Sequence, residues 1–240
     1  MRAGALLVLV AACGTSAPKQ TEAPVVSSKN TTRVPVEEPE EEGVTIVNAR
    51  GRMDTDAIAA GLEPHNAALM DCYMSKLERR RWIGGHVVLH WEIKKDGTIS
   101  AVKLAESDLG AWPIEKCLLE VARSATFAKP IGGDADFSIP LDFAAKGRLV
   151  TWEEDKGLKA VGGQTVKLDA CAKGKVPAPS DVTVTVYVGP AGKAQSVGFA
   201  SAKTTIDDAW ADCAEKAALA WRLPDPKGVV AKLAIKYRAD

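Results

Sequence analysis

The chain has 240 residues, and its 31 basic side chains balance 31 acidic ones, so the formal net charge is zero. No net field therefore favours nucleic acid or an anionic surface, and any partner has to be recognised locally. Outside one N-terminal apolar segment, no stretch has the roughly 18 apolar residues that a membrane-spanning helix needs. Only that segment is expected to contact a membrane through its backbone.

The N-terminus has the pattern of an export signal that ends at a cysteine. Arg2 precedes an apolar segment at residues 5–10, and residues 9–13 read Leu-Val-Ala-Ala-Cys. This run resembles the lipobox of bacterial lipoproteins, which implies removal of residues 1–12, a lipid on Cys13 and a tether facing the periplasm. The alternatives are an ordinary secretory signal or a buried apolar start. Gly14 is not the Asp that retains many lipoproteins at the inner membrane, which favours the outer membrane.

Residues 13–52 have the composition of a spacer. Thr, Ser, Pro, Lys and Gln dominate, and an acidic run follows at residues 37–42. Such a segment cannot build an apolar core, and a flexible coil of about 39 residues would reach on the order of 35 Å. We therefore expect a lipidated, disordered tether. The acidic run could instead dock on a basic partner.

Four cysteines remain for the folded part: Cys72, Cys117, Cys171 and Cys213. In an oxidising compartment an even set predicts two disulfides, and four cysteines allow three connectivities. The separations within the first two and within the last two are nearly equal, which favours Cys72 with Cys117 and Cys171 with Cys213. The alternative is four buried free thiols.

Residues 53–145 show a pattern of helix, hairpin, helix and strand. Apolar and polar residues alternate before Asp96-Gly97, which predicts two strands joined by a tight turn. Pro140 inside the last strand predicts a sheet edge, because proline cannot donate to an inner ladder. The expected elements are a helix at 64–80, strands at 85–93 and 99–104, a helix at 112–124 and a strand at 137–143.

Residues 164–240 repeat this pattern more loosely, after a linker at 146–163. Counted from the second cysteine of each pair, Phe127 and Leu223 share one position, and Pro130 and Pro226 share another. This register indicates an internal duplication. The expected elements are a remnant helix at 167–173, strands at 182–188 and 194–199, a helix at 205–221 and a strand at 229–237.

The first repeat also carries a family pattern. Its residues are Cys72-Tyr73, Leu77, Gly84-Gly85, Trp91, Asp96-Gly97, Cys117 and Pro130-x-Gly132-Gly133. Residues 53–145 thereby resemble the AgmX/PglI C-terminal domain family, a TonB C-terminal-like domain, and residues 164–240 resemble a degenerate second copy.

This resemblance implies an α+β protein of two tandem αββαβ units, each with two helices on a three-stranded sheet and one disulfide. It also implies protein contacts in the periplasm of Gram-negative bacteria, and it brings no catalytic residues. TonB itself has a transmembrane anchor, whereas this chain has a lipidation signal, which argues against energy transduction by this chain alone.

No enzymatic constellation is present in the sequence. There is no Gly-x-Ser-x-Gly, His-Glu-x-x-His, phosphate-binding glycine loop or Cys-x-x-Cys. His86 and His90 share a strand face, but four strand positions separate them by about 13 Å, which is too far for one metal ion. We therefore expect no enzyme, no metal and no cofactor.

Aromatic and basic residues suggest where a ligand could bind. Trp91, Trp112, Trp210 and Trp221 lie in predicted elements and are expected in the core. Trp82 and Trp152 are the better candidates for contact with a sugar ring. The cluster Lys76, Arg79, Arg80 and Arg81 could bind anionic glycans or lipid phosphates, although a helix C-terminus favours cations in any case.

Two functions remain. The first is a non-enzymatic, lipid-anchored periplasmic adaptor that binds another envelope protein by strand addition at the edges 137–143 and 229–237. The alternative is a lipoprotein that binds peptidoglycan or another envelope glycan.

Overall fold

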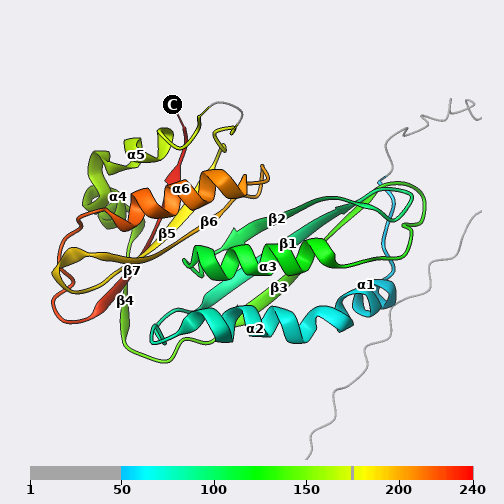
Figure 1. Ribbon diagram of the computed structural model, residues 1–240, viewed down its shortest axis with the longest axis horizontal. Coiled ribbons are helices and arrows are strands. Elements are labelled where there is room, and N and C mark those ends of the chain that lie inside the picture. Colours follow the sequence, from blue (N-terminus) through cyan, green and yellow to red (C-terminus); the bar gives the residue numbers. More distant parts are fainter. Residues whose placement is uncertain (1–49, 174–175, 240) are drawn as a thin grey trace, which may run out of the picture. The chain divides into compact units, whose positions relative to one another are not determined.

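The structure is a computed structural model that describes residues 50–173 and 176–239 (Figure 1). The expected signal peptide, Cys13 and the tether as far as residue 49 lie outside the described residues. Residues 51 and 52, expected in the tether, belong to the folded part: the Gly51 amide donates to Asp134 O at 2.8 Å, and Arg52 forms a β-bridge with Ile131. None of the described helices has the length and apolar character needed to cross a membrane.

The first part of the chain has the predicted order of elements. It contains α1 (Thr55–Leu62), α2 (Asn66–Leu77), β1 (Gly85–Ile93), β2 (Ile99–Ser107), α3 (Trp112–Ser124) and β3 (Ala135–Phe143). The antiparallel sheet has the order β2-β1-β3. The single helix predicted at 64–80 is wrong in its bounds: a short 3₁₀ turn at Glu63–His65 separates α1 from α2, and α2 ends at Leu77 because Glu78 has a φ of 52°.

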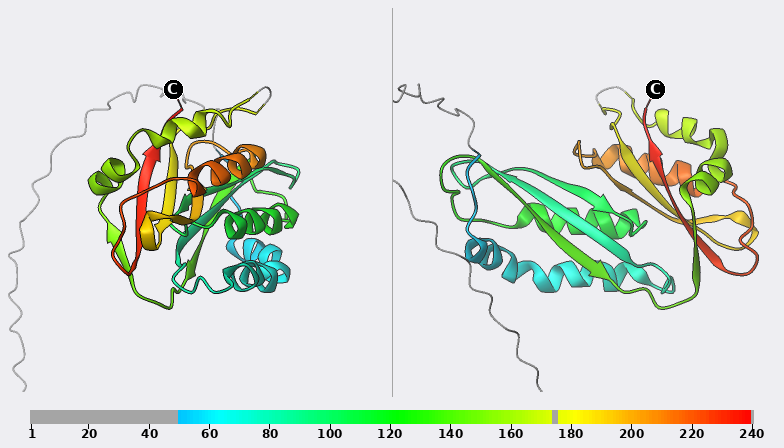
Figure 2. Two further views of the ribbon diagram at one scale, coloured as in Figure 1. Left: turned by 60° about the vertical axis from the view of Figure 1, so that its left-hand side comes forward. Right: turned by 180° about the vertical axis from the view of Figure 1, so that it is seen from behind.

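One face of this first sheet is buried beneath α2 and α3 (Figure 2). The alternate residues Val87, Leu89, Trp91 and Ile93 of β1 are at most 1 % exposed. The Trp91 indole donates from Nε1 to the Ala122 carbonyl of α3 at 2.9 Å, which satisfies its only polar atom. The predicted burial of one face of this strand is therefore confirmed.

The second part is larger than the predicted repeat. It contains β4 (Leu149–Trp152), α4 (Glu154–Val161), α5 (Val166–Asp169), β5 (Val182–Val188), β6 (Ala194–Ala200), α6 (Asp208–Leu219) and β7 (Val230–Tyr237). Short 3₁₀ turns lie at Gly162–Thr165 and Pro190–Gly192. The sheet has the order β4-β7-β5-β6, with β4 parallel to β7.

Two predictions for this part are wrong. Residues 146–163 are not a linker, because they contain β4 and α4, and the sheet has four strands in place of three. The segment 229–237 is not a sheet edge, because β7 lies between β4 and β5. The four-residue strand β4 is too short to show a period, and its parallel partner is about 80 positions away in the sequence.

Both disulfides join the predicted cysteines. Cys72–Cys117 links α2 to α3, and Cys171–Cys213 links the turn after α5 to α6. The predicted pairing is confirmed, with sequence separations of 45 and 42 residues. Cys171 lies two residues beyond α5, so the prediction that it lies on a helix is wrong.

The two parts share one core. The described residues of both belong to a single compact unit, and their buried apolar side chains form one continuous cluster. Phe199 of β6 contacts Trp112 of α3 and Trp210 of α6 edge to face, with ring centroids 6.0 and 5.4 Å apart. A backbone hydrogen bond from the Ser201 amide to Leu104 O, at 2.9 Å, also crosses between the parts. The two parts are therefore not independently folded domains.

Candidate functional site

β3 is an open sheet edge. It pairs with β1 along its whole length, from Gly85 opposite Phe143 to Ile93 opposite Ala135, and no described strand pairs with its other side. Pro140, opposite Val88, has no N–H to donate, so its backbone faces away from β1. The edge position that Pro140 predicts is confirmed.

The orientation of Pro140 sets the orientation of its alternate neighbours. Because the pattern repeats every second residue, Asp136, Ser138 and Asp142 also direct their backbone N–H and C=O groups away from β1. Ser138, Pro140 and Asp142 are exposed. These positions give an incoming strand three donors and four acceptors, with one donor missing at the centre.

The two histidines of β1 lie beside this edge, on the face away from the helices. His86 Nδ1 lies 2.8 Å from Asp142 Oδ1, and this hydrogen bond raises the pKa of His86. His90 Nδ1 lies 2.9 Å from Ser138 Oγ, and burial lowers the pKa of His90. Both histidines thus hold β3 through cross-strand pairs. Within residues 50–173 and 176–239, no three metal-ligating side chains cluster together.

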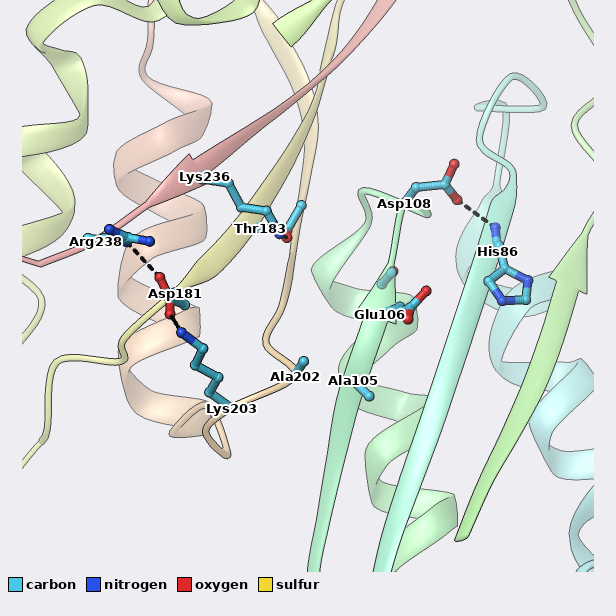
Figure 3. A pocket seen from close by; sticks show the side chains of 11 residues that line it. His86, Ala105, Glu106, Asp108, Asp181, Thr183, Ala202, Lys203, Lys236 and Arg238 are labelled. Carbon is cyan, nitrogen blue, oxygen red and sulfur yellow. Dashed lines mark hydrogen bonds and ion pairs between the residues drawn. The ribbon is translucent and has the colours of Figure 1, made fainter.

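A second feature is a charged cleft of about 670 Å³ between the two parts (Figure 3). One wall comes from the β1–β2 side of the first sheet, and the other comes from β5, β7 and the loop after β6. We define the charged cleft by its ionic side chains, which are Glu106, Asp108, Asp181, Lys203, Lys236 and Arg238.

The charges of this cleft are only partly paired. Asp181 accepts from Arg238 Nε at 2.6 Å and from Lys203 Nζ, and these bonds, that to Lys203 first, lower the pKa of Asp181. Asp108 forms an ion pair with Lys232 at 2.9 Å. Lys236 Nζ donates to Thr183 Oγ1 at 2.6 Å. Among the described residues, neither Lys236 nor Glu106 forms a salt bridge, although Glu106 lies close enough to His86 to act on its charge.

The residues expected to bind a glycan lie in different places. The Trp82 ring packs against Tyr187 with centroids 4.8 Å apart, so one of its faces is used within the protein. Arg79 and Arg81 are exposed beyond α2, whereas Arg80 donates to Lys76 O at 3.1 Å. Trp152 is only 6 % exposed, carries Lys156 over its ring at 4.6 Å, and borders a separate groove. The structure does not gather these side chains into one surface.

Sequence reasoning missed the ionic residues of the cleft and the buried Glu115. Glu115, in the first turn of α3, is fully buried between the two parts. An acidic residue in the first turn of a helix is common and gives no sign of burial. The cleft residues come from segments about 75 to 130 positions apart, and no local pattern joins them.

Comparison with known proteins adds no relative. No family model matches the chain, and neither the curated proteins nor the solved structures gave a significant match.

Proposed function

We propose that this protein is a non-enzymatic, lipid-anchored adaptor of the Gram-negative envelope that faces the periplasm and is held at the outer membrane. Its two folded parts are tandem TonB C-terminal-like units, the first of the AgmX/PglI type, and it binds another envelope protein by adding a strand to β3. The observation that carries this proposal is the open side of the nine-residue strand β3. The two disulfides suit an oxidising compartment.

Among the described strands, β3 is the best placed to accept a partner. β7 is an inner strand, and β4 has only four residues. The end of β6 runs into Ser201, whose amide bonds to Leu104 of β2, so these two edges lie against each other at that point. β3, in contrast, is an edge strand of nine residues, and no described strand pairs with its outer side. Strand addition there would satisfy backbone groups that otherwise depend on water.

The side chains of β3 indicate what the partner strand carries. Asp136 forms an ion pair with Arg50, and Asp142 bonds to His86. Opposite charges on directly facing strand positions are favourable, so Lys or Arg on the partner strand would fit this edge. Because Pro140 lacks a donor, the partner strand loses one hydrogen bond near the centre of the interface.

The test uses Ser138→Pro and Asp142→Pro in the full-length, lipidated protein. Each change removes one outward N–H and leaves the ladder to β1 in place. Ser138→Ala and Asp142→Ala are the matched controls, because they remove the same side chains and keep the N–H. In-cell crosslinking with mass spectrometry should identify one envelope protein whose yield falls at least tenfold in both proline variants and in neither alanine variant.

Two outcomes would count against this function. Full capture of the same partner by both proline variants would exclude strand addition at β3. Unchanged capture by a Cys13→Ser protein, which cannot be lipidated, would show that the tether is not needed. Thermal unfolding of each variant shows whether the fold is retained.

The second candidate is a peptidoglycan or envelope-glycan binder. It is favoured by a groove of about 440 Å³ beside Trp152, which also contains Lys156 and Lys227. Sedimentation with purified sacculi tests it, with Lys156→Ala and Lys227→Ala as variants. If the wild-type protein stays in the supernatant after sedimentation, glycan binding is excluded.

A further inference from the structure

The basic wall of the charged cleft has more positive than negative side chains. Lys203 and Arg238 share the single carboxylate of Asp181, and Lys236 is held by the neutral hydroxyl of Thr183. This wall therefore carries three cations and one anion. Hydrogen bonds to Asp181 and Thr183 position all three cations, so an incoming anion would meet an ordered site.

The opposite wall carries two acidic side chains, Asp108 and Glu106. Asp108 is held on both oxygens, since Oδ1 accepts from the His86 amide at 2.5 Å and Oδ2 pairs with Lys232. Glu106 projects from β2 near the cleft (Figure 3), forms no salt bridge among the described residues, and has the imidazole of His86 as its cationic neighbour. The cleft thus presents a positive wall facing one carboxylate, that of Glu106, which forms no salt bridge among the described residues. This polarity disfavours a compact dianion such as phosphate and favours a ligand with separated positive and negative groups.

The space between the walls suits a slender ligand. Ala105 and Ala202 lie opposite each other between the charged side chains, as Figure 3 shows, and neither occupies much volume. The volume of about 670 Å³ lies within the range of sites for small ligands and short peptides. A peptide end has a single terminal carboxylate and a narrow backbone.

We propose that the charged cleft binds the C-terminal carboxylate of a short peptide, which pairs with Lys236, while a basic residue earlier in that peptide faces Glu106. Lys203 and Arg238 supply the surrounding positive potential. This site is separate from the β3 edge and goes beyond the adaptor function, because the peptide can be bound whether or not a strand adds to β3.

The experiment measures binding of the probe acetyl-Lys-Ala-Ala by isothermal titration calorimetry at low salt. Three comparison ligands are its C-terminal amide, acetyl-Glu-Ala-Ala and sodium acetate. The free acid should bind at least tenfold more tightly than the amide and than the Glu peptide. Acetate at equal concentration should not displace it.

Variants of the protein locate the site. Lys236→Met, which keeps an unbranched side chain on β7, should weaken binding at least tenfold, and Lys236→Arg should restore most of it. Lys159→Met is the matched control, because Lys159 is exposed on α4 and does not border the cleft. Glu106→Gln should reduce the preference for the Lys peptide over the Glu peptide.

Several results would overturn the proposal. These are no binding at millimolar peptide, equal binding of acid and amide, equal displacement by acetate, or an unchanged affinity in Lys236→Met. Ser138→Pro should bind the peptide as the wild type does. A failure of the adaptor function at β3 is thereby distinguished from a failure of this site.

Discussion

The backbone N–H of Phe199 donates a hydrogen bond of 2.9 Å to Oε2 of Glu115, so a side chain of α3 is fixed to β6 of the other part. Glu115 Oε1 accepts from Ser107 Oγ at 2.7 Å. The backbone amides of Gly110 and Ala111 also favour the charged form of this carboxylate. These donors offset part of the cost of burying a charge, and they tie both parts of the chain to one side chain.

The stability of the protein should fall between acidic and neutral pH because of Glu115. Burial raises its pKa from the ordinary 4.5 to about 7. The folded state therefore holds the proton more tightly than the unfolded chain, and the free energy of unfolding decreases as pH rises through this window. The shift corresponds to about 3 kcal/mol at most.

Urea unfolding at pH 5 and pH 8 checks this, with Glu115→Gln as the reference. The glutamine imitates the protonated acid at every pH, so the variant should lose less stability between the two values. His86 and His90 titrate equally in both proteins and cancel in the comparison. Identical pH profiles for the two proteins would contradict the prediction.

Gly198→Ala should destabilise the protein by about 1–3 kcal/mol through overpacking. A Cβ at this position would lie 2.4 Å from both carboxylate oxygens of Glu115 and 2.6 Å from Ala111 N. Gly163→Ala is the control, because a Cβ there has nothing within 4 Å. Calorimetric unfolding should show a lower Tm for Gly198→Ala only. A drop of the same size in both variants would mean that close packing at Gly198 is not the cause.

Loss of either disulfide should lower the free energy of unfolding by about 4 kcal/mol on the chain-entropy model. The sequence separations are 45 and 42, so the double replacements Cys72→Ala/Cys117→Ala and Cys171→Ala/Cys213→Ala should cost nearly the same. Urea unfolding of both variants measures the two losses. If one loss is several times the other, loop closure does not explain the stabilisation.

Tyr187→Phe should cost about 1–3 kcal/mol, because it leaves a buried amide without a partner. The Tyr187 hydroxyl donates to Gly84 O at 2.9 Å and accepts from Gly84 N at 3.2 Å. Lys232 Nζ also donates to Gly84 O, at 3.1 Å, so the carbonyl keeps a donor when the hydroxyl is removed and the amide is the group expected to lose its bond. Equilibrium unfolding gives the loss, and faster exchange of the Gly84 amide hydrogen would locate it. Wild-type stability with wild-type exchange would refute this assignment.

Local chemistry made much of the first part predictable. Alternation over residues 87–93 and the Asp96-Gly97 turn predicted the β1–β2 hairpin, and Pro140 predicted the edge position of β3. Each signal lies within a few residues of the element that it specifies. The nearly equal spacing of the two cysteine pairs predicted both disulfides.

The sequence by itself thus determined six of the seven described strands, most helices, the disulfide pairing and one open edge. Only the tertiary structure decided that β4 covers β7, that Glu115 lies buried against Phe199, and that Glu106 and Lys236 border one cleft. The physical reason is the range of the interactions. Hydrophobic period and turn geometry act between near neighbours, whereas the docking of two sheets depends on many small contacts between residues far apart in the chain.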